Sequence, residues 1–160
     1  DENKISPIEF GKAQILRKGQ SVALFAVGTM VEKAEQVADL LEKHGVYTSV
    51  INARFVKPLD EDLIVNLGRD AKLLVSLEEN TIHGGFGSGM LEILSKNRIC
   101  IPTLQIGAPD RFIPQGSPEE QLNEAELNVD QIYGRVLEKL PEVVKKIRKK
   151  RIMEQKKRAS

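Results

Sequence analysis

Residues 73–90 read LLVSLEENTIHGGFGSGM, an apolar run followed by two glutamates and a corner that holds four glycines. The run from Leu73 to Leu77 predicts a buried strand, and apolar residues recur at helical spacing from Met90 onward, which predicts a helix. We call residues 82–89 the glycine corner, because glycines there permit positive φ and a close approach of backbone. In open α/β sheets the carboxyl end of a parallel strand is where function usually lies.

Backbone N–H groups at the start of a helix favour an anion or a carboxylate. The glycine corner is therefore either a ligand cradle or a site of tight packing between strand and helix. Glu78 and Glu79 are adjacent on the predicted strand, so they point to opposite faces and do not form a pair of catalytic carboxylates. One of them is free to accept hydrogen bonds from the glycine corner or to pair with an arginine.

The rest of the chain alternates between strands and helices. Nearly continuous apolar segments at 21–27, 48–53 and 103–106 predict further strands. One helix is predicted after Thr29, which would cap it together with Glu32, and Gly45 would end it. A second is predicted at 59–67 and closed by Gly68. Two more are predicted to begin at Ser117 and at Asn128, the latter capped with Gln131. Repeated strand–helix units predict a largely parallel sheet with helices on both faces.

Strand ends of such a sheet meet at one edge, which predicts a shared polar surface there. Its two arginines, Arg54 and Arg111, follow the second and fourth of these strands. Each is a candidate partner for a glutamate, either within a self-satisfied network of ion pairs or across a domain or subunit boundary. The candidate surface consists of Arg54, Glu78, Glu79, His83, Gly84, Gly85, Gly87, Asp110 and Arg111.

The sequence offers few residues for other kinds of chemistry. Two histidines and one cysteine are too few for a zinc site, and we predict no metal ligands and no catalytic residue in this chain. Cys100 lies in an apolar run and is predicted to be buried. His44 is predicted to interact with a helix dipole. His83, in the glycine corner, is a candidate for substrate contact, and the sequence leaves open whether it makes one.

Composition favours a single soluble domain, with 41% hydrophobic and 29% charged residues among 160. No apolar run is long enough to cross a membrane. Residues 145–160 carry nine basic residues and one glutamate, so the rest of the chain is acidic. We predict that this basic segment is a solvated extension; it has no aromatic residue to stack on bases, so we expect no nucleic-acid partner.

Three further strings decide the family that the chain resembles. NARFVKPLDE stands at 52–61, EEN precedes GGFGSG at 78–89, and PDRFIPQGS stands at 109–117. Together they are similar to the C-terminal domain of the 1-deoxy-D-xylulose-5-phosphate (DXP) synthases, thiamine-diphosphate enzymes of the transketolase superfamily. The resemblance runs from about Pro7 to Leu140.

The resemblance implies a three-layer α/β/α fold with a mostly parallel five-stranded sheet and one antiparallel edge strand. We expect residues 1–20 to be a linker or entry segment and 21–143 to be the domain; the resemblance does not cover residues 144–160, which we expect to be a basic tail on their charge. The intact enzyme would be a transferase that condenses pyruvate with glyceraldehyde 3-phosphate, with loss of CO₂, in isoprenoid precursor biosynthesis. Thiamine diphosphate and Mg²⁺ would bind in domains that precede this one.

This chain would then be inactive alone, and its role would be to assemble with those preceding domains and with a second subunit in a homodimer. The enzyme would lie in the bacterial cytoplasm or the plastid stroma. A beginning at Asp1 rather than Met favours a piece of a longer or processed polypeptide. Two alternatives remain open. One is the corresponding domain of a transketolase or of a 2-oxo-acid dehydrogenase β subunit, and the other is a stand-alone module that binds a small anion or docks a protein.

Overall fold

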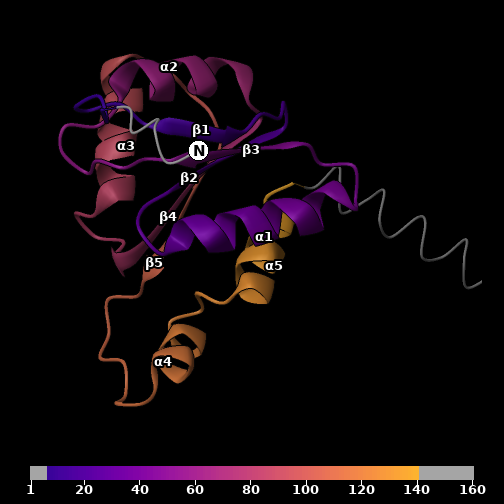
Figure 1. The fold of residues 1–160 in the computed structure, drawn as a ribbon, viewed down its shortest axis with the longest axis vertical. Helices are drawn as coiled ribbons and strands as arrows, with labels where there is room; N and C mark the ends of the chain where they lie inside the picture. Colours follow the sequence, from indigo (N-terminus) through magenta and orange to yellow (C-terminus); the bar gives the residue numbers. More distant parts are fainter. Residues whose placement is uncertain (1–6, 141–160) are drawn as a thin grey trace, which may run out of the picture.

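The computed structural model describes residues 7–140, which form a five-stranded sheet with helices on both faces (Figure 1). The strand order is β1-β3-β2-β4-β5, with β1 antiparallel to β3 and the other pairs parallel. The predicted mixed sheet with one antiparallel edge strand is therefore confirmed. The elements are β1 (Gln14–Arg17), β2 (Val22–Ala26), α1 (Met30–Glu42), β3 (Thr48–Asn52), α2 (Glu61–Asp70), β4 (Leu73–Thr81), α3 (Phe86–Lys96), β5 (Thr103–Ala108), α4 (Pro118–Glu124) and α5 (Val129–Glu138).

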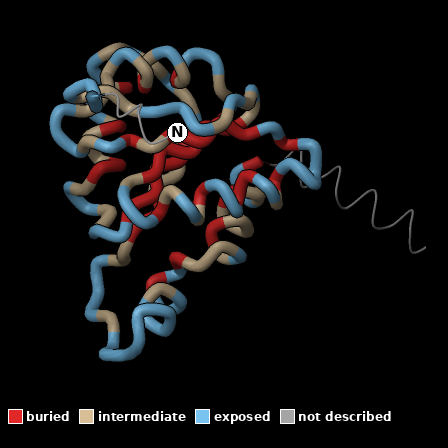
Figure 2. Tube along the Cα trace, in the orientation of Figure 1, coloured by how far each residue is buried: buried red, intermediate tan, exposed pale blue. Residues whose placement is uncertain are grey.

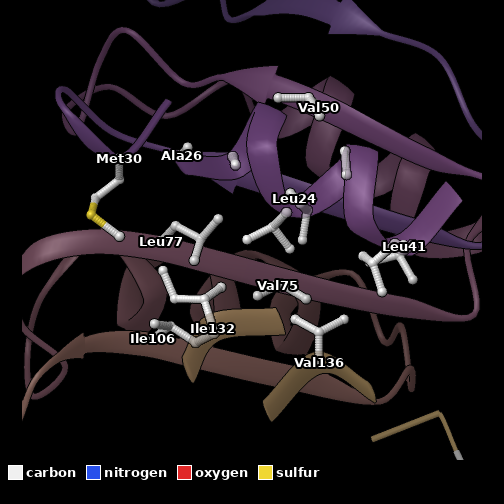
Figure 3. Close-up of a cluster of buried hydrophobic side chains, with 14 of the residues drawn as sticks. Leu24, Ala26, Met30, Leu41, Val50, Val75, Leu77, Ile106, Ile132 and Val136 are labelled. Carbon is white, nitrogen blue, oxygen red and sulfur yellow. The ribbon is translucent and has the colours of Figure 1, made fainter. Parts of the chain in front are cut away.

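Two apolar layers sandwich the sheet, because successive residues of its central strands face opposite sides. On one side Leu24 and Val75 pack in one cluster with α1 and α5, and Figure 3 shows Met30 near Leu77 and Val136 near Val75 in this cluster. On the other side the strands pack against α2 and α3. Every residue of β2 is buried, and burial is concentrated in these central strands (Figure 2).

The antiparallel edge strand β1 lies within the segment that we expected to be a linker. It pairs with β3 through Gln14 opposite Asn52, with an irregularity between Ile15 and Arg17. The Asp60 carboxylate accepts from the backbone N–H of Ala13 at 3.0 Å and thereby ties this strand to the start of α2. Residues 14–17, within the expected linker, therefore belong to the sheet.

Helix α2 differs from the prediction. It begins at Glu61 and runs to Asp70, because Asp60 supplies the cap by accepting from Leu63 N–H. Gly68 does not end the helix but lies buried within it, where a Cβ would come within 2.8 Å of Leu94 Cδ2. The glycine serves close packing of α2 on α3 rather than termination.

Other predicted helix ends were mostly correct. Ser117 and Asn128 each form a full capping box, and Gly45 has φ of +74° where the chain leaves α1. The predicted Thr29 cap was wrong: Thr29 is itself helical (φ −61°, ψ −21°) and its side chain makes no capping hydrogen bond.

Cys100 was predicted to be buried and is exposed. It lies in the connection between α3 and β5, where the flanking isoleucines turn inward and leave the thiol outside. Among residues 7–140 no helix is long and apolar enough to span a membrane. The basic tail that we predicted at 144–160 lies outside the described residues.

Candidate functional site

The polar site begins at an irregularity in the pairing of β4 with β5. Leu77 pairs with Ile106 and Thr81 with Ala108, so three residues of β4 face the single residue Gly107. A Cβ at Gly107 would lie 2.7 Å from Asn80 O and 3.0 Å from Glu78 Cγ. Glycine at this position therefore leaves room for the bulged strand, which twists sharply at such an insertion.

The bulge directs Glu78 inward and Glu79 outward. Glu78 is only 3% exposed, and its two carboxylate oxygens accept from the backbone N–H groups of Phe86 at 2.8 Å and Gly87 at 2.9 Å. The N-cap residue of α3 is Gly85, which has no side chain to cap the helix. Glu78 therefore caps α3 from the preceding strand, with its negative charge at the positive end of the helix.

This arrangement confirms that one glutamate accepts hydrogen bonds from the glycine corner. The carboxylate favoured by the start of α3 is the chain's own, because Glu78 occupies two of the N–H groups that an external anion would use. The second glutamate, Glu79, is exposed, and the described part of the chain provides no hydrogen bond or ion pair for its side chain.

The glycines of the corner have separate structural roles. Gly84 has φ of +74° and donates its N–H to Ser88 Oγ, which donates in turn to Ile82 O. Gly85 has φ of −82°, so the positive φ that the corner's glycines permit is not adopted there. Glycine is required at 85 for space, because a Cβ would lie 2.3 Å from both Glu78 Oε2 and Thr81 O. At Gly87 a Cβ would meet Ser76 Oγ at 2.4 Å.

A groove of about 350 Å³ lies beside this cap, at the carboxyl ends of β2 and β4. The starts of α1 and α3 both reach it, together with the outward-facing residues of the bulge. Its lining residues are Val27, Gly28, Thr29, Val56, Glu78, Glu79, Asn80, Gly84, Gly85 and Phe86. Glu79, Asn80 and Thr29 supply its exposed polar side chains, so the groove presents a carboxylate, an amide and a hydroxyl beside two helix N-termini.

The predicted arginines do not join this site. Arg54 at the end of β3 is exposed and donates to Gln14 Oε1, toward the edge strand. Arg111 donates to Glu124 Oε1 at 2.7 Å and to Glu124 O at 2.8 Å. Within residues 7–140 neither arginine is paired with Glu78 or Glu79, and each instead contacts a residue of another element.

His83 and Asp110 are both exposed on loops. The backbone N–H of His83 donates to Thr81 Oγ1 at 3.3 Å. Its ring is not part of the groove lining. His44, predicted to interact with a helix dipole, places Nδ1 3.1 Å from Leu40 O and 2.9 Å from the Tyr133 hydroxyl.

Some lining residues were absent from our prediction. Gly28 and Thr29 end β2 and begin α1, and Val56 follows β3 in the string NARFVKPLDE. Gly28 has φ of +60°. The sequence did carry a signal for these residues. They directly follow predicted strands, and the ends of parallel strands lie at the same edge of the sheet as Glu78.

The groove offers groups for polar contact, because the Glu79 carboxylate and the Asn80 amide are exposed in it. Among the described residues no three His, Cys, Asp or Glu side chains cluster to hold a metal ion. The pKa of Glu61 is lowered by hydrogen bonds from Asn97 and Lys96, and that of Lys12 is raised by Asp62 and Asp60. Both groups lie outside the groove lining.

Comparison with known proteins identifies relatives across most of this chain. The family description "Transketolase, C-terminal domain" matches residues 11–132. The DXP synthase of Acaryochloris marina is 45% identical over 131 residues, which are 82% of this chain and 21% of that enzyme. The DXP synthase of Thermosynechococcus vestitus is 42% identical over 133 residues, 83% of this chain and 21% of that enzyme. The chain thus spans about a fifth of the length of these relatives.

Solved structures share the fold. A chain described as a split-gene transketolase, inactive β4 tetramer, superposes with a TM-score of 0.78 at 30% identity. The superposed region is 84% of this chain and 44% of that one. The transketolase of Campylobacter jejuni superposes with a TM-score of 0.51 at 16% identity, over 80% of this chain and 18% of its own. The latter likeness concerns the fold alone.

Proposed function

This chain belongs to the transketolase C-terminal domain family, and from that premise we propose that it is the C-terminal domain of a DXP synthase. The observation that carries the proposal is the 42–45% identity to named DXP synthases over more than four-fifths of the chain. The solved split-gene transketolase is 30% identical, which favours the synthase over a transketolase.

The intact enzyme condenses pyruvate with glyceraldehyde 3-phosphate, releases CO₂ and forms DXP, a precursor of isoprenoids. Thiamine diphosphate supplies the carbanion chemistry of such an enzyme. The donor set of this chain does not fit either cofactor's anchor: its described residues form no metal-ligand cluster, and Glu78 already occupies N–H groups that a diphosphate would use. We therefore assign thiamine diphosphate and Mg²⁺ to the preceding domains.

The role of this chain in the enzyme is assembly. The Glu78 cap fixes the start of α3 and the adjoining bulge, which makes the edge of the sheet a rigid surface. Glu79, Asn80 and Thr29 on that surface are placed for hydrogen bonds to a preceding domain or to a second subunit. A tetramer of the split-gene relative supports the proposal that the enzyme self-associates, as a homodimer in our account.

A stand-alone anion-binding module is less well supported. Such a module needs free N–H groups at the glycine corner, and two of those groups donate to Glu78. The similarity to the bacterial synthases favours a cytoplasmic location, with a plastid stroma as the alternative.

The test is DXP formation from pyruvate and glyceraldehyde 3-phosphate, with thiamine diphosphate and Mg²⁺ present. It compares this 160-residue chain, the complete enzyme that contains it, and that enzyme truncated before Pro7. We expect activity only from the complete enzyme, and a smaller oligomer from the truncated one in analytical ultracentrifugation. DXP formation by the 160-residue chain alone, or full activity and unchanged assembly after truncation, would contradict the proposal.

A further inference from the structure

The connection after β5 projects from the sheet. We call residues 109–127, which include α4, the arm; Figure 1 shows α4 standing apart from the sheet and from the other helices. Helix α4 has no buried residue, and Phe112 in the loop before it is fully exposed. Arg111 donates to the side-chain Oε1 and to the backbone O of Glu124, which joins the loop to the end of the helix.

A second groove, of about 320 Å³, lies between the arm and the carboxyl ends of β4 and β5. Its walls are mainly apolar, formed by Ala108, Ile113, Pro118, Leu122 and Leu127. Glu79 stands at its rim and also lines the groove beside the Glu78 cap. We call this the arm groove.

The arm, which forms one wall of this groove, is acidic. Residues 109–127 contain five acidic side chains and one basic one, and the basic one, Arg111, is paired with Glu124. All five acidic residues of the arm are exposed, and Glu79 adds a sixth carboxylate. A segment that complements this surface therefore carries apolar side chains for the groove and basic side chains on either side of them for the acidic residues of the arm.

The chain itself contains such a segment. Residues 145–160 carry nine Lys or Arg and one Glu, and the large apolar residues among them are Ile147, Ile152 and Met153. We propose that this basic segment docks onto the arm of the same chain, with these three apolar side chains in the arm groove and the basic residues against the acidic side chains of the arm.

The length of the chain permits this contact. Leu127 of the arm groove is followed directly by α5, so Leu140 lies within about 20 Å of it at 1.5 Å per helical residue. The twelve residues from 141 to 152 span up to about 40 Å when extended at about 3.3 Å each. The segment can therefore return along α5 and bring Ile152 and Met153 to the groove.

Charge also favours the segment over a second copy of the arm. Two arms placed face to face would bring five acidic residues of one chain against five of the other, which is repulsive. The basic segment reverses the sign of that interaction. Docking within one chain also proceeds at high effective concentration, because the two parts are linked.

The test is paramagnetic relaxation enhancement on the full 160-residue chain. Cys100→Ser removes the single natural thiol, and Glu154→Cys carries a nitroxide beside Met153. We expect the amide signals of Leu122, Ala125 and Leu127 to lose most of their intensity, while Ile64 on the opposite face of the sheet keeps its intensity. Raising the salt to about 1 M, where the screening length is about 3 Å, should restore part of the signal.

The matched control is Ile147→Ser, Ile152→Ser and Met153→Ser together, which keeps all nine basic residues and removes the apolar anchors. We expect the arm signals to recover in this variant. Unchanged arm signals in the parent, or equal losses in the triple variant, would overturn the proposal. Losses in a mixture of isotope-labelled chain without nitroxide and unlabelled chain with it would show that a second copy is the occupant, which also overturns it.

Discussion

Removal of the Glu78 carboxylate should strongly destabilise the domain. In Glu78→Ala the backbone N–H groups of Phe86 and Gly87 lose their acceptors and remain buried. Each hydrogen bond to a charged group contributes about 1.5–3 kcal/mol, so the two together predict a loss of about 3–6 kcal/mol. A domain of this kind has about 5–15 kcal/mol of total stability, so the loss is a large part of it.

The assay is urea denaturation followed by circular dichroism, with thermal unfolding as a second probe. At about 2–4 °C per kcal/mol, the expected fall in Tm is about 6–24 °C. The control is Glu79→Ala, the exposed neighbour, which should change stability by no more than about 0.5 kcal/mol. Glu78→Gln should lie between the two, because the amide retains one acceptor and places an NH₂ group against an N–H. A loss below about 1 kcal/mol in Glu78→Ala would refute the account of the cap.

Three further outcomes are expected. Gly85→Ala should lower the free energy of unfolding by at least about 3 kcal/mol in urea denaturation, because its Cβ would collide with Glu78 Oε2. Gly84→Ala, at positive φ in open space, should lower it by about 1–2 kcal/mol. Equal losses in the two variants would contradict the steric explanation. His83→Ala in the complete enzyme should reduce kcat/KM by less than about tenfold and leave the oligomer intact in ultracentrifugation, and a loss beyond about a thousandfold would place the ring in the reaction. The backbone N–H of the N-cap serine of α4, followed by its hydroxyl, lowers the pKa of Glu120, so the stability that this carboxylate contributes is present above the ordinary glutamate pKa and disappears as the pH falls through the lowered value. Carboxyl NMR titration should show this lowered pKa, and Glu120→Gln should remove that part of the acid dependence; a pKa at or above the ordinary range would contradict it.

The sequence predicted the sheet well because its parallel strands are short apolar runs bounded by glycine or by capping residues. Burial on both faces requires such runs, so β2 and β4 are visible without any tertiary information. The edge strand β1 lacks this signal: three of its four residues are exposed, and only the resemblance implied a strand of its kind. The full capping boxes at Ser117 and Asn128 were readable because they depend on local sequence alone.

The errors arose where a tertiary contact determined the role of a residue. Gly68 reads as a helix end and is instead the place where α2 approaches Leu94. Gly85 reads as a residue of positive φ, yet the carboxylate that crowds it comes from β4. Thr29 has the sequence of a cap, but its backbone is already helical.

The sequence predicted the part of the candidate site that depends on local contacts and missed the part that depends on tertiary contacts. Glu78, Glu79 and the corner glycines meet because they are neighbours in sequence across one turn, and adjacent strand residues must face opposite sides. The directions of Arg54 and Arg111 depend on Gln14 and Glu124, which belong to other elements. No local pattern specifies those partners. The two arginines therefore lie outside the groove, which contains fewer of the predicted polar residues than the sequence suggested.

The most direct test of the central claim is calorimetric titration of thiamine diphosphate, in the presence of Mg²⁺, into this 160-residue chain and into the complete enzyme that contains it. Our account predicts no heat of binding for the 160-residue chain and saturable binding by the complete enzyme. Saturable binding by the 160-residue chain alone would contradict it, because the cofactor would then have a site among residues to which we assign none.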